Sequence, residues 1–216
     1  MYWTEKYRPY HLDDVAGNQQ VIGELKKYAK LKVSDLPNLL FYGSPGVGKT
    51  STAYAFCFDG NHAYKDINSA QLNGKNDMDE FVHTLGSVGA GISNFETTEG
   101  EDDYTEGMIL IFDKAEMLTK QAQNVLEKAL ESRTDAKAIF IANDIGNFTE
   151  PMLSRFTAFK FDRLKDKEIE MLLLKIAEKE NLRVPEGALR DIIRDADGIP
   201  RSAITALEKY WIITTH

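Results

Sequence analysis

A glycine-rich stretch near residue 45 carries the residue types that are needed to hold phosphate groups. It follows an apolar run, precedes a helical pattern, and consists of Gly43, Ser44, Pro45, Gly46, Val47, Gly48, Lys49, Thr50 and Ser51. Glycines let successive backbone amides turn toward phosphate oxygens, and the next helix presents its positive amino end. In this P-loop pattern the lysine reaches the β- and γ-phosphates and the threonine hydroxyl ligates magnesium. The stretch therefore predicts a purine nucleotide site.

A second chemical feature is the acid that ends the apolar run Met108–Phe112. Behind a P-loop, a carboxylate at the end of a buried strand can reach the magnesium shell, so Asp113 and Thr50 are the predicted metal ligands. Many ATPases of this design place next a glutamate that activates the attacking water, but this chain has Lys114. A charged lysine cannot accept a proton from water. Lys114 can instead hold the phosphate electrostatically, and Glu116 is expected to point elsewhere.

The elements that must position these residues alternate between strands and helices. Continuous apolar runs predict strands at Leu39–Tyr42, Ala63–Asn68, Met108–Phe112, Ala138–Ile141 and Ala158–Phe161. Helical patterns begin near Lys49, Asp77 and Lys120; in the last, the Lys, Glu and Gln residues are expected to face away from the apolar stripe. Strands of this kind separated by helices indicate an α/β fold with a mainly parallel sheet covered on both faces.

The strand signal disappears after residue 161, and three helical patterns follow. Asp166 is expected to cap the first, Pro185 to open the second, and Ser202 to begin the third, which runs to about Ile212. We therefore expect a nucleotide-binding α/β domain over residues 1–162 and a small helical lid domain over residues 163–216.

Composition narrows the class of protein. The 216 residues carry a net charge of −8 with a pI near 5.1, which argues against a surface coated with basic charge for indiscriminate nucleic-acid binding. The single cysteine, Cys57, excludes an internal disulfide framework. No apolar run has the length of a membrane span, and the acidic stretch 94–107 is expected to be a solvated loop. We expect an intracellular protein, cytoplasmic, nuclear or encoded by a phage.

Five segments together resemble a known family. In chain order they are WTEKYRPYHLDDVAGNQQVI, GSPGVGKTSTA, AEMLTKQAQNVLEKALE, FIANDIGNFTEPMLSRF and GIPRSAITALEKY. The chain is similar to the sliding-clamp loaders of DNA replication, which are AAA+ ATPases, and in particular to small subunits of replication factor C and the ATPase subunit of phage clamp loaders. The resemblance implies a P-loop AAA+ domain followed by a helical lid, with ATP and Mg²⁺ as cofactors.

The resemblance also implies roles for individual residues. Asn143 matches sensor 1, which orients the hydrolytic water or the γ-phosphate, and Arg201 matches sensor 2, which couples the lid to that phosphate. Arg155 matches the arginine finger, which reaches the nucleotide of a neighbouring subunit; the family usually has Cys where Phe156 follows it. The segment that cradles adenine is matched by Tyr7, Arg8, Pro9, Val15, Ala16 and Gly17.

The implied partners are other clamp-loader subunits, a sliding clamp and primer–template DNA held by its backbone. Candidate DNA contacts are Lys75, Lys120 and Lys128. The family's collar domain, which joins the subunits into a ring, is expected to be absent because the chain ends at His216, just after the lid. Three hypotheses stay open. The first is a hydrolysing clamp-loader subunit, and the second, raised by Lys114, is a non-hydrolysing ATP-dependent structural subunit of such a complex. The third is another AAA+ remodeller, such as a DNA branch-migration motor or a helicase loader, against which the segments EKYRP and LTKQAQN argue.

Overall fold

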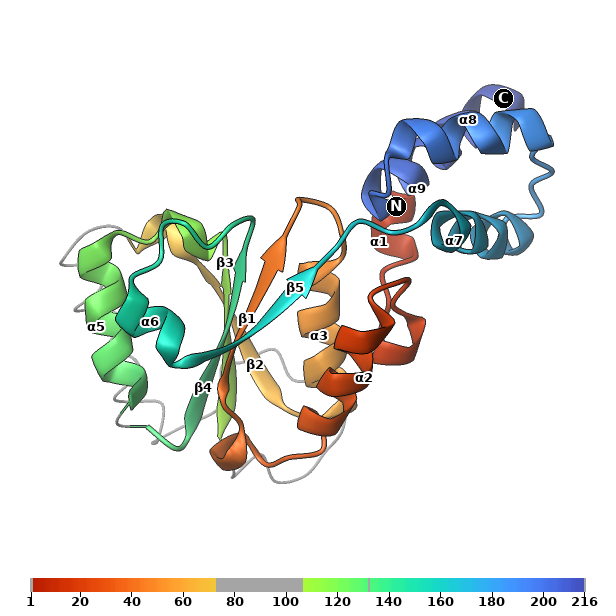
Figure 1. Cartoon of the computed structure of the whole chain (residues 1–216). Helices are drawn as coiled ribbons and strands as arrows, with labels where there is room; N and C mark the ends of the chain where they lie inside the picture. The colour runs from red at the N-terminus through yellow and green to blue at the C-terminus, as the bar shows by residue number, and fades with distance from the viewer. Residues whose placement is uncertain (1, 73–106, 132, 216) are drawn as a thin grey trace.

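The computed structural model describes residues 2–72, 107–131 and 133–215. Its sheet has five parallel strands in the order β2-β3-β4-β1-β5 (Figure 1). The strands are β1 (Asn38–Gly43), β2 (Ala63–Asn68), β3 (Met108–Asp113), β4 (Ala136–Ala142) and β5 (Phe156–Phe161). Each of the five predicted strands is confirmed, with ends that differ by at most two residues. The predicted helix near Asp77 and the acidic stretch up to residue 106 lie outside the described residues.

Helices cover both faces of the sheet, as predicted (Figure 1). One face holds α2 (Gln19–Tyr28) and α3 (Lys49–Asp59), and the other holds α5 (Lys120–Glu131) and α6 (Glu150–Ser154). Because side chains alternate along a strand, β1 sends Leu39 and Phe41 into the first core cluster and Leu40 into the second. Short 3₁₀ turns complete this part of the chain: η1 (Leu12–Asp14), η2 (Val33–Asp35), η3 (Ser69–Gln71) and η5 (Ala115–Met117).

Three helices follow the sheet and share a third core cluster; we refer to them together as the lid. They are α7 (Asp166–Lys179), α8 (Glu186–Ala196) and α9 (Pro200–Thr215). The predicted cap at Asp166 is wrong: the N-cap is Lys165, whose backbone N–H donates to Glu168 Oε2 at 2.8 Å. Asp166 instead lies in the first turn, where a carboxylate still favours the positive helix end. The third helix begins two residues before the predicted Ser202, with Pro200 at its first position.

The amino-terminal helix α1 (Trp3–Lys6) packs on the lid rather than on the sheet (Figure 1). The Trp3 ring is buried and lies 5.4 Å, centroid to centroid, from that of Trp211. The Trp3 backbone N–H donates to Glu208 Oε1 at 3.1 Å. The predicted adenine segment therefore runs from the lid to the sheet, and residues from both ends of the chain share one core.

A short hinge joins the sheet to the lid. Asn18 exchanges two hydrogen bonds with the backbone of Asp162, at 2.9 and 3.1 Å, and Leu164 N–H donates to Gly198 O at 2.8 Å. Gly17 has φ +69°, and a Cβ there would lie 2.6 Å from Leu164 Cγ. This contact requires glycine. In the described ranges, no helix is both long and apolar enough to cross a bilayer.

Candidate functional site

The P-loop lies between β1 and α3, at the carboxyl end of the sheet. Gly46 and Gly48 have φ values of +80° and +105°, a backbone region that glycine adopts without steric cost. A Cβ on Gly43 would lie 2.1 Å from Phe161 O, so the loop also packs tightly on β5. A Cβ on Gly48 would meet no atom within 4 Å, so the space in front of this residue is open. The backbone of this loop therefore leaves room for phosphate oxygens, and its role as a phosphate cradle stays a prediction.

The Lys49 side chain occupies this cradle. Its amine donates to Gly43 O at 2.7 Å, to Ser44 O at 2.9 Å and, more weakly, to Asn143 Oδ1 at 3.4 Å. The residue is 6% exposed, and burial lowers the pKa of Lys49 to about 8 although the charges of Glu116 and Asp113 oppose that shift. The amine is thus held where it can exchange backbone carbonyls for phosphate oxygens.

Asn143 follows β4 and connects Lys49 to a carboxylate. Its amide nitrogen donates to Glu116 Oε1 at 2.6 Å, while Glu116 Oε2 is buried with no hydrogen-bond partner among the described residues. The expectation that Glu116 points elsewhere is therefore wrong. Lys114 has left-handed φ and ψ of 54° and 43°, and the 3₁₀ turn η5 follows it. This reversal brings residue 116 back to the strand ends, beside Asn143.

Gln123 on α5 holds the segment after η5 and the segment after β4 together through its side-chain amide. Its amide nitrogen donates to Leu118 O at 3.1 Å and Asn147 O at 2.9 Å, and its oxygen accepts from Thr149 N–H at 2.9 Å. The side chain is fully buried, so the prediction that every Gln of α5 faces away from the core is wrong at this position. A buried amide is tolerated here because its donors and acceptor are all paired.

The predicted metal ligands lie on separate elements. Thr50 is half-buried in the first turn of α3, and Asp113 is exposed at the end of β3, where its Oδ1 accepts from Lys114 N–H at 3.0 Å. Among the described residues, no three His, Cys, Asp or Glu side chains cluster as a metal site would require. One carboxylate and one hydroxyl suit Mg²⁺ that also binds phosphate oxygens and water. Their ligand role stays a prediction.

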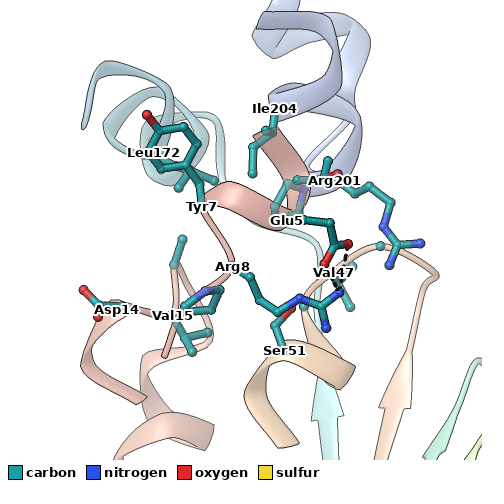
Figure 2. Close-up of a pocket in the computed structure, with 16 residues that line it drawn as sticks. Glu5, Tyr7, Arg8, Asp14, Val15, Val47, Ser51, Leu172, Arg201 and Ile204 are labelled. Atoms are coloured by element: carbon teal, nitrogen blue, oxygen red, sulfur yellow. Dashed lines mark hydrogen bonds and ion pairs between the residues drawn. The ribbon is translucent and has the colours of Figure 1, made fainter. Parts of the chain in front are cut away.

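A pocket lies between the segment that precedes α2 (residues 2–18, here called the arm), the P-loop and the lid (Figure 2). Its walls include Tyr7, Arg8, Pro9, Val15 and Ala16 of the arm, Gly46, Val47, Gly48 and Ser51 of the P-loop and α3, and Leu172, Arg201 and Ile204 of the lid. Of the predicted adenine residues, Gly17 alone is not in this lining; it contacts Leu164 at the hinge. Ser44 and Pro45 lie in the loop outside the pocket wall.

Tyr7 and Arg8 on the arm side of the pocket are both held by carboxylates. Glu180 Oε1 accepts from both the Tyr7 hydroxyl and the Lys6 amine, each at 2.5 Å. Burial raises the pKa of Tyr7, and the bond to Glu180 raises it further, so the hydroxyl stays protonated. Arg8 donates to both carboxylate oxygens of Glu5, at 2.9 and 2.7 Å, as Figure 2 shows. Lys6 and Tyr7 therefore both bind the arm to Glu180 of the lid, and Arg8 contributes an ion-paired cation to the pocket wall.

Arg201 brings the lid to the P-loop. It lies in the first turn of α9, and its backbone N–H is 3.4 Å from Gly46 O. The Arg201 charge is one of the causes that lower the pKa of Lys49, which places the two cations in one electrostatic field. Two cationic residues and the amino end of α3 thus lie at the P-loop, an arrangement suited to a polyanion.

Arg155 is the one predicted catalytic residue that lies apart. It immediately precedes Phe156, which pairs with Asn38 at the amino end of β1, whereas the P-loop follows Gly43 at the carboxyl end. The length of β1, about 17 Å at the usual rise per residue, separates Arg155 from its own P-loop.

Two carboxylates on α5 bind the Arg155 guanidinium. Nε donates to Glu127 Oε1 and Nη1 contacts Glu131 Oε1, both at 2.8 Å. The bond to Glu131, and then that to Glu127, raises the pKa of Arg155 above its usual range. The candidate DNA contacts Lys120 and Lys128 are exposed on the same helix, and Lys75 lies outside the described residues. Sequence reasoning did not predict the pairing of Arg155 with Glu127.

Comparisons with known proteins agree with this geometry. The model of the ATPase family associated with various cellular activities (AAA) matches residues 39–163. The chain is 34% identical over 95% of its length to replication factor C subunit 4 of Homo sapiens, and 34% identical over 95% to a replication factor C small subunit of Archaeoglobus fulgidus. It spans 57% and 62% of those two proteins.

A solved structure shows the same fold. The RuvB Holliday junction branch migration motor of Thermotoga maritima superposes with a TM-score of 0.77 over 97% of this chain and 67% of that one, at 19% identity. At this identity the likeness shows the fold alone. The predicted resemblance is confirmed by the curated relatives, and the sheet, P-loop and family match agree with it. The chain belongs to the AAA family of ATPases and is a relative of the small subunits of replication factor C.

Proposed function

We propose that this chain is the ATP-binding part of a clamp-loader subunit, which acts with other subunits to open a sliding clamp and place it on primer–template DNA. The observation that supports this most directly is the division of the predicted residues between the two ends of β1. Lys49, Asn143 and Arg201 converge at the carboxyl end. Arg155 lies at the amino end, beyond reach of the same nucleotide. A site divided in this way works when a neighbouring subunit supplies the arginine.

The residues present fit ATP and Mg²⁺. The positive-φ glycines leave room for phosphate oxygens, and Lys49 and Arg201 supply compensating charge. Thr50 and Asp113 would hold Mg²⁺, which when bound would neutralise charge on the phosphates. The pocket between arm and lid would take the adenine, with Tyr7, Val15 and Ala16 at its wall. Binding there contacts both the sheet and the lid, so ATP would set their relative position.

The proposed partners follow from the family and from the surface. Arg155 would act on a neighbouring subunit's γ-phosphate, which requires an oligomer. Exposed Lys120 and Lys128 on α5 would contact the DNA backbone, which needs charge but no base reading. The relatives are named as replication factor C subunits, and the clamp and DNA partners are proposed for this chain on that likeness.

A second candidate function is a structural subunit that binds ATP without hydrolysing it. Lys114 favours it, since this exposed cation takes the place of the usual glutamate. A DNA branch-migration motor is the third hypothesis, and the only support for it here is a shared fold at 19% identity.

One experiment tests the leading proposal. The chain is mixed with the remaining subunits and the clamp of a replication factor C system, with and without MgATP, and the mass of the complexes and the transfer of clamp onto primed circular DNA are measured. We expect ATP-dependent incorporation and clamp loading with the wild-type chain, and no clamp loading with Lys49→Ala. Equal incorporation and loading with and without ATP would contradict the proposal. Preference for a four-way junction over primed DNA would favour the branch-migration reading.

A further inference from the structure

We infer that Glu116 supplies the carboxylate that Lys114 cannot, so that the chain retains a way to activate the attacking water. The inference rests on the proposed function, because it concerns how bound ATP would be hydrolysed. Three independent observations support it: the position of Glu116, the free oxygen that it presents, and the conformation of Lys114.

The position comes from a short chain of hydrogen bonds. Lys49 Nζ lies 3.4 Å from Asn143 Oδ1, and Asn143 Nδ2 lies 2.6 Å from Glu116 Oε1. Glu116 is therefore two hydrogen bonds from the amine that reaches the γ-phosphate. Its charge also has the larger of the two carboxylate effects on Lys49, ahead of Asp113. The carboxylate thus lies on the side of the cradle where the terminal phosphate would be.

The free oxygen is the second observation. Glu116 Oε1 is engaged by Asn143, while Oε2 is buried and has no partner in the described parts of the chain. A buried carboxylate oxygen without a donor is costly, and structures keep such groups where a ligand or water completes them. The Glu116 backbone is held as well, because its carbonyl accepts from Asn147 Nδ2 at 2.7 Å. The Glu116 side chain is therefore held in place, and its Oε2 is available to accept a further hydrogen bond.

The conformation of Lys114 is the third observation. The residue is left-handed and exposed, and its backbone N–H is bonded to Asp113 Oδ1. Lys114 therefore lies on the exposed side of this turn, whereas Glu116, two residues later, is partly buried and bonded to Asn143. A carboxylate is thus present at the strand ends although residue 114 is a lysine.

Water held between Asn143 and Glu116 attacks the γ-phosphorus, and its proton passes to Glu116 Oε2. The bond between the γ-phosphorus and the bridging oxygen breaks, and its electron pair leaves with ADP. Inorganic phosphate is released, and Glu116 returns its proton to solvent.

Glu116→Gln tests the inference, because it keeps an oxygen for Asn143 but removes the charge and the proton acceptor. The first readout is the ratio of ATP to ADP affinity of the full chain, measured by titration calorimetry with Mg²⁺. Removing a negative charge beside the γ-phosphate should tighten ATP about fivefold to tenfold and leave ADP within twofold. Glu170→Gln removes an exposed glutamate on α7 and should change neither affinity.

The second readout is single-turnover hydrolysis in the assembled complex. We expect a loss of about 100-fold with Glu116→Gln and partial recovery with Glu116→Asp, whereas Lys114→Ala should stay within threefold of wild type. An unchanged ATP-to-ADP ratio together with unchanged turnover would overturn the inference and leave the proposed function standing. Intact ATP in a wild-type complex that loads clamps would also overturn it. Failure of the wild-type chain to bind ATP would instead refute the proposed function.

Discussion

The cations near the two ends of strand β1 differ in burial and in the groups that bind them. At the carboxyl end, Lys49 is buried among backbone carbonyls and coupled to Asn143, Glu116 and Arg201. At the amino end, Arg155 is 38% exposed and bonded to two glutamates of its own chain. The first set is organised by one folded chain. Under the proposed function, the second would act on a nucleotide only when another subunit brings its phosphates to Arg155, and the two glutamates would then have to release the guanidinium.

The largest expected effect concerns the carboxyl end alone. Lys49→Ala removes a cation that would make two charge-assisted bonds to phosphate, so ATP affinity should fall roughly 1000-fold. Arg155→Ala should leave ATP affinity of the isolated chain within twofold, because the residue is a strand length away. Calorimetric titration of both variants measures the difference. Equal losses would show that the two ends are not independent.

A mixing experiment sharpens the contrast next. Arg155→Ala should lower turnover in an assembled complex about 1000-fold, the usual contribution of such an arginine. A mixture of Arg155→Ala with Lys49→Ala chains should recover activity, since one variant retains a nucleotide site and the other an arginine. Arg190→Ala, an exposed arginine on α8, serves as the matched control. No recovery in the mixture would mean that Arg155 acts within its own chain.

The pH dependence of ATP binding should distinguish Lys49 from Arg155, with a smaller effect than the substitutions above. Burial lowers the pKa of Lys49 to about 8 in the free chain, and bound phosphate would raise it again. ATP affinity should therefore be full below pH 8 and fall by up to about tenfold per pH unit above it. Arg155 stays charged throughout, because its two glutamates raise its pKa. Titrations between pH 7 and 9.5 measure this, with Lys49→Arg as the variant whose affinity should not follow pH.

The smallest effect should come from freeing Arg155. The double change Glu127→Gln and Glu131→Gln removes both charges that bind the guanidinium, but these pairs are partly solvent-exposed and weak. ATP-dependent association of the chains should strengthen by roughly twofold to fivefold, because less is lost on transferring Arg155 to a neighbour's phosphate. Analytical ultracentrifugation measures the association, and Glu170→Gln is the control. Weaker association would mean that the glutamates help to present the arginine.

The sequence predicted the fold well because the signals are local. Buried strands read as apolar runs, and the P-loop places its glycines and lysine within one turn between a strand and a helix. The segment proposed to hold adenine was predicted from the sequence, yet the wall of the pocket that it lines also includes Leu172, Arg201 and Ile204 of the lid. The docking of α1 on α9 was missed, because Trp3 and Glu208 are 205 residues apart and no local period reports such a contact.

Polar residues at the site were the harder part. A helical pattern places Gln123 beside the apolar stripe, but its burial depends on three backbone groups, two of which belong to the distant residues 147 and 149. Glu116 was expected to point away because residue spacing on a regular element was assumed. The left-handed Lys114 and the turn after it break that spacing. Side-chain direction in a turn follows from backbone dihedrals that sequence spacing does not contain.

By itself the sequence determined the strand order along the chain, the phosphate cradle, the family resemblance and the unusual Lys114, since each depends on residues within one short segment. Only the tertiary structure decided that Glu116 bonds to Asn143, which is 27 residues away in the chain. It also decided that Arg155 lies a strand length from its own P-loop and is bonded to two glutamates. Those outcomes depend on how separate segments pack, because burial and charge pairing are properties of the assembled core and surface, and no single segment carries them.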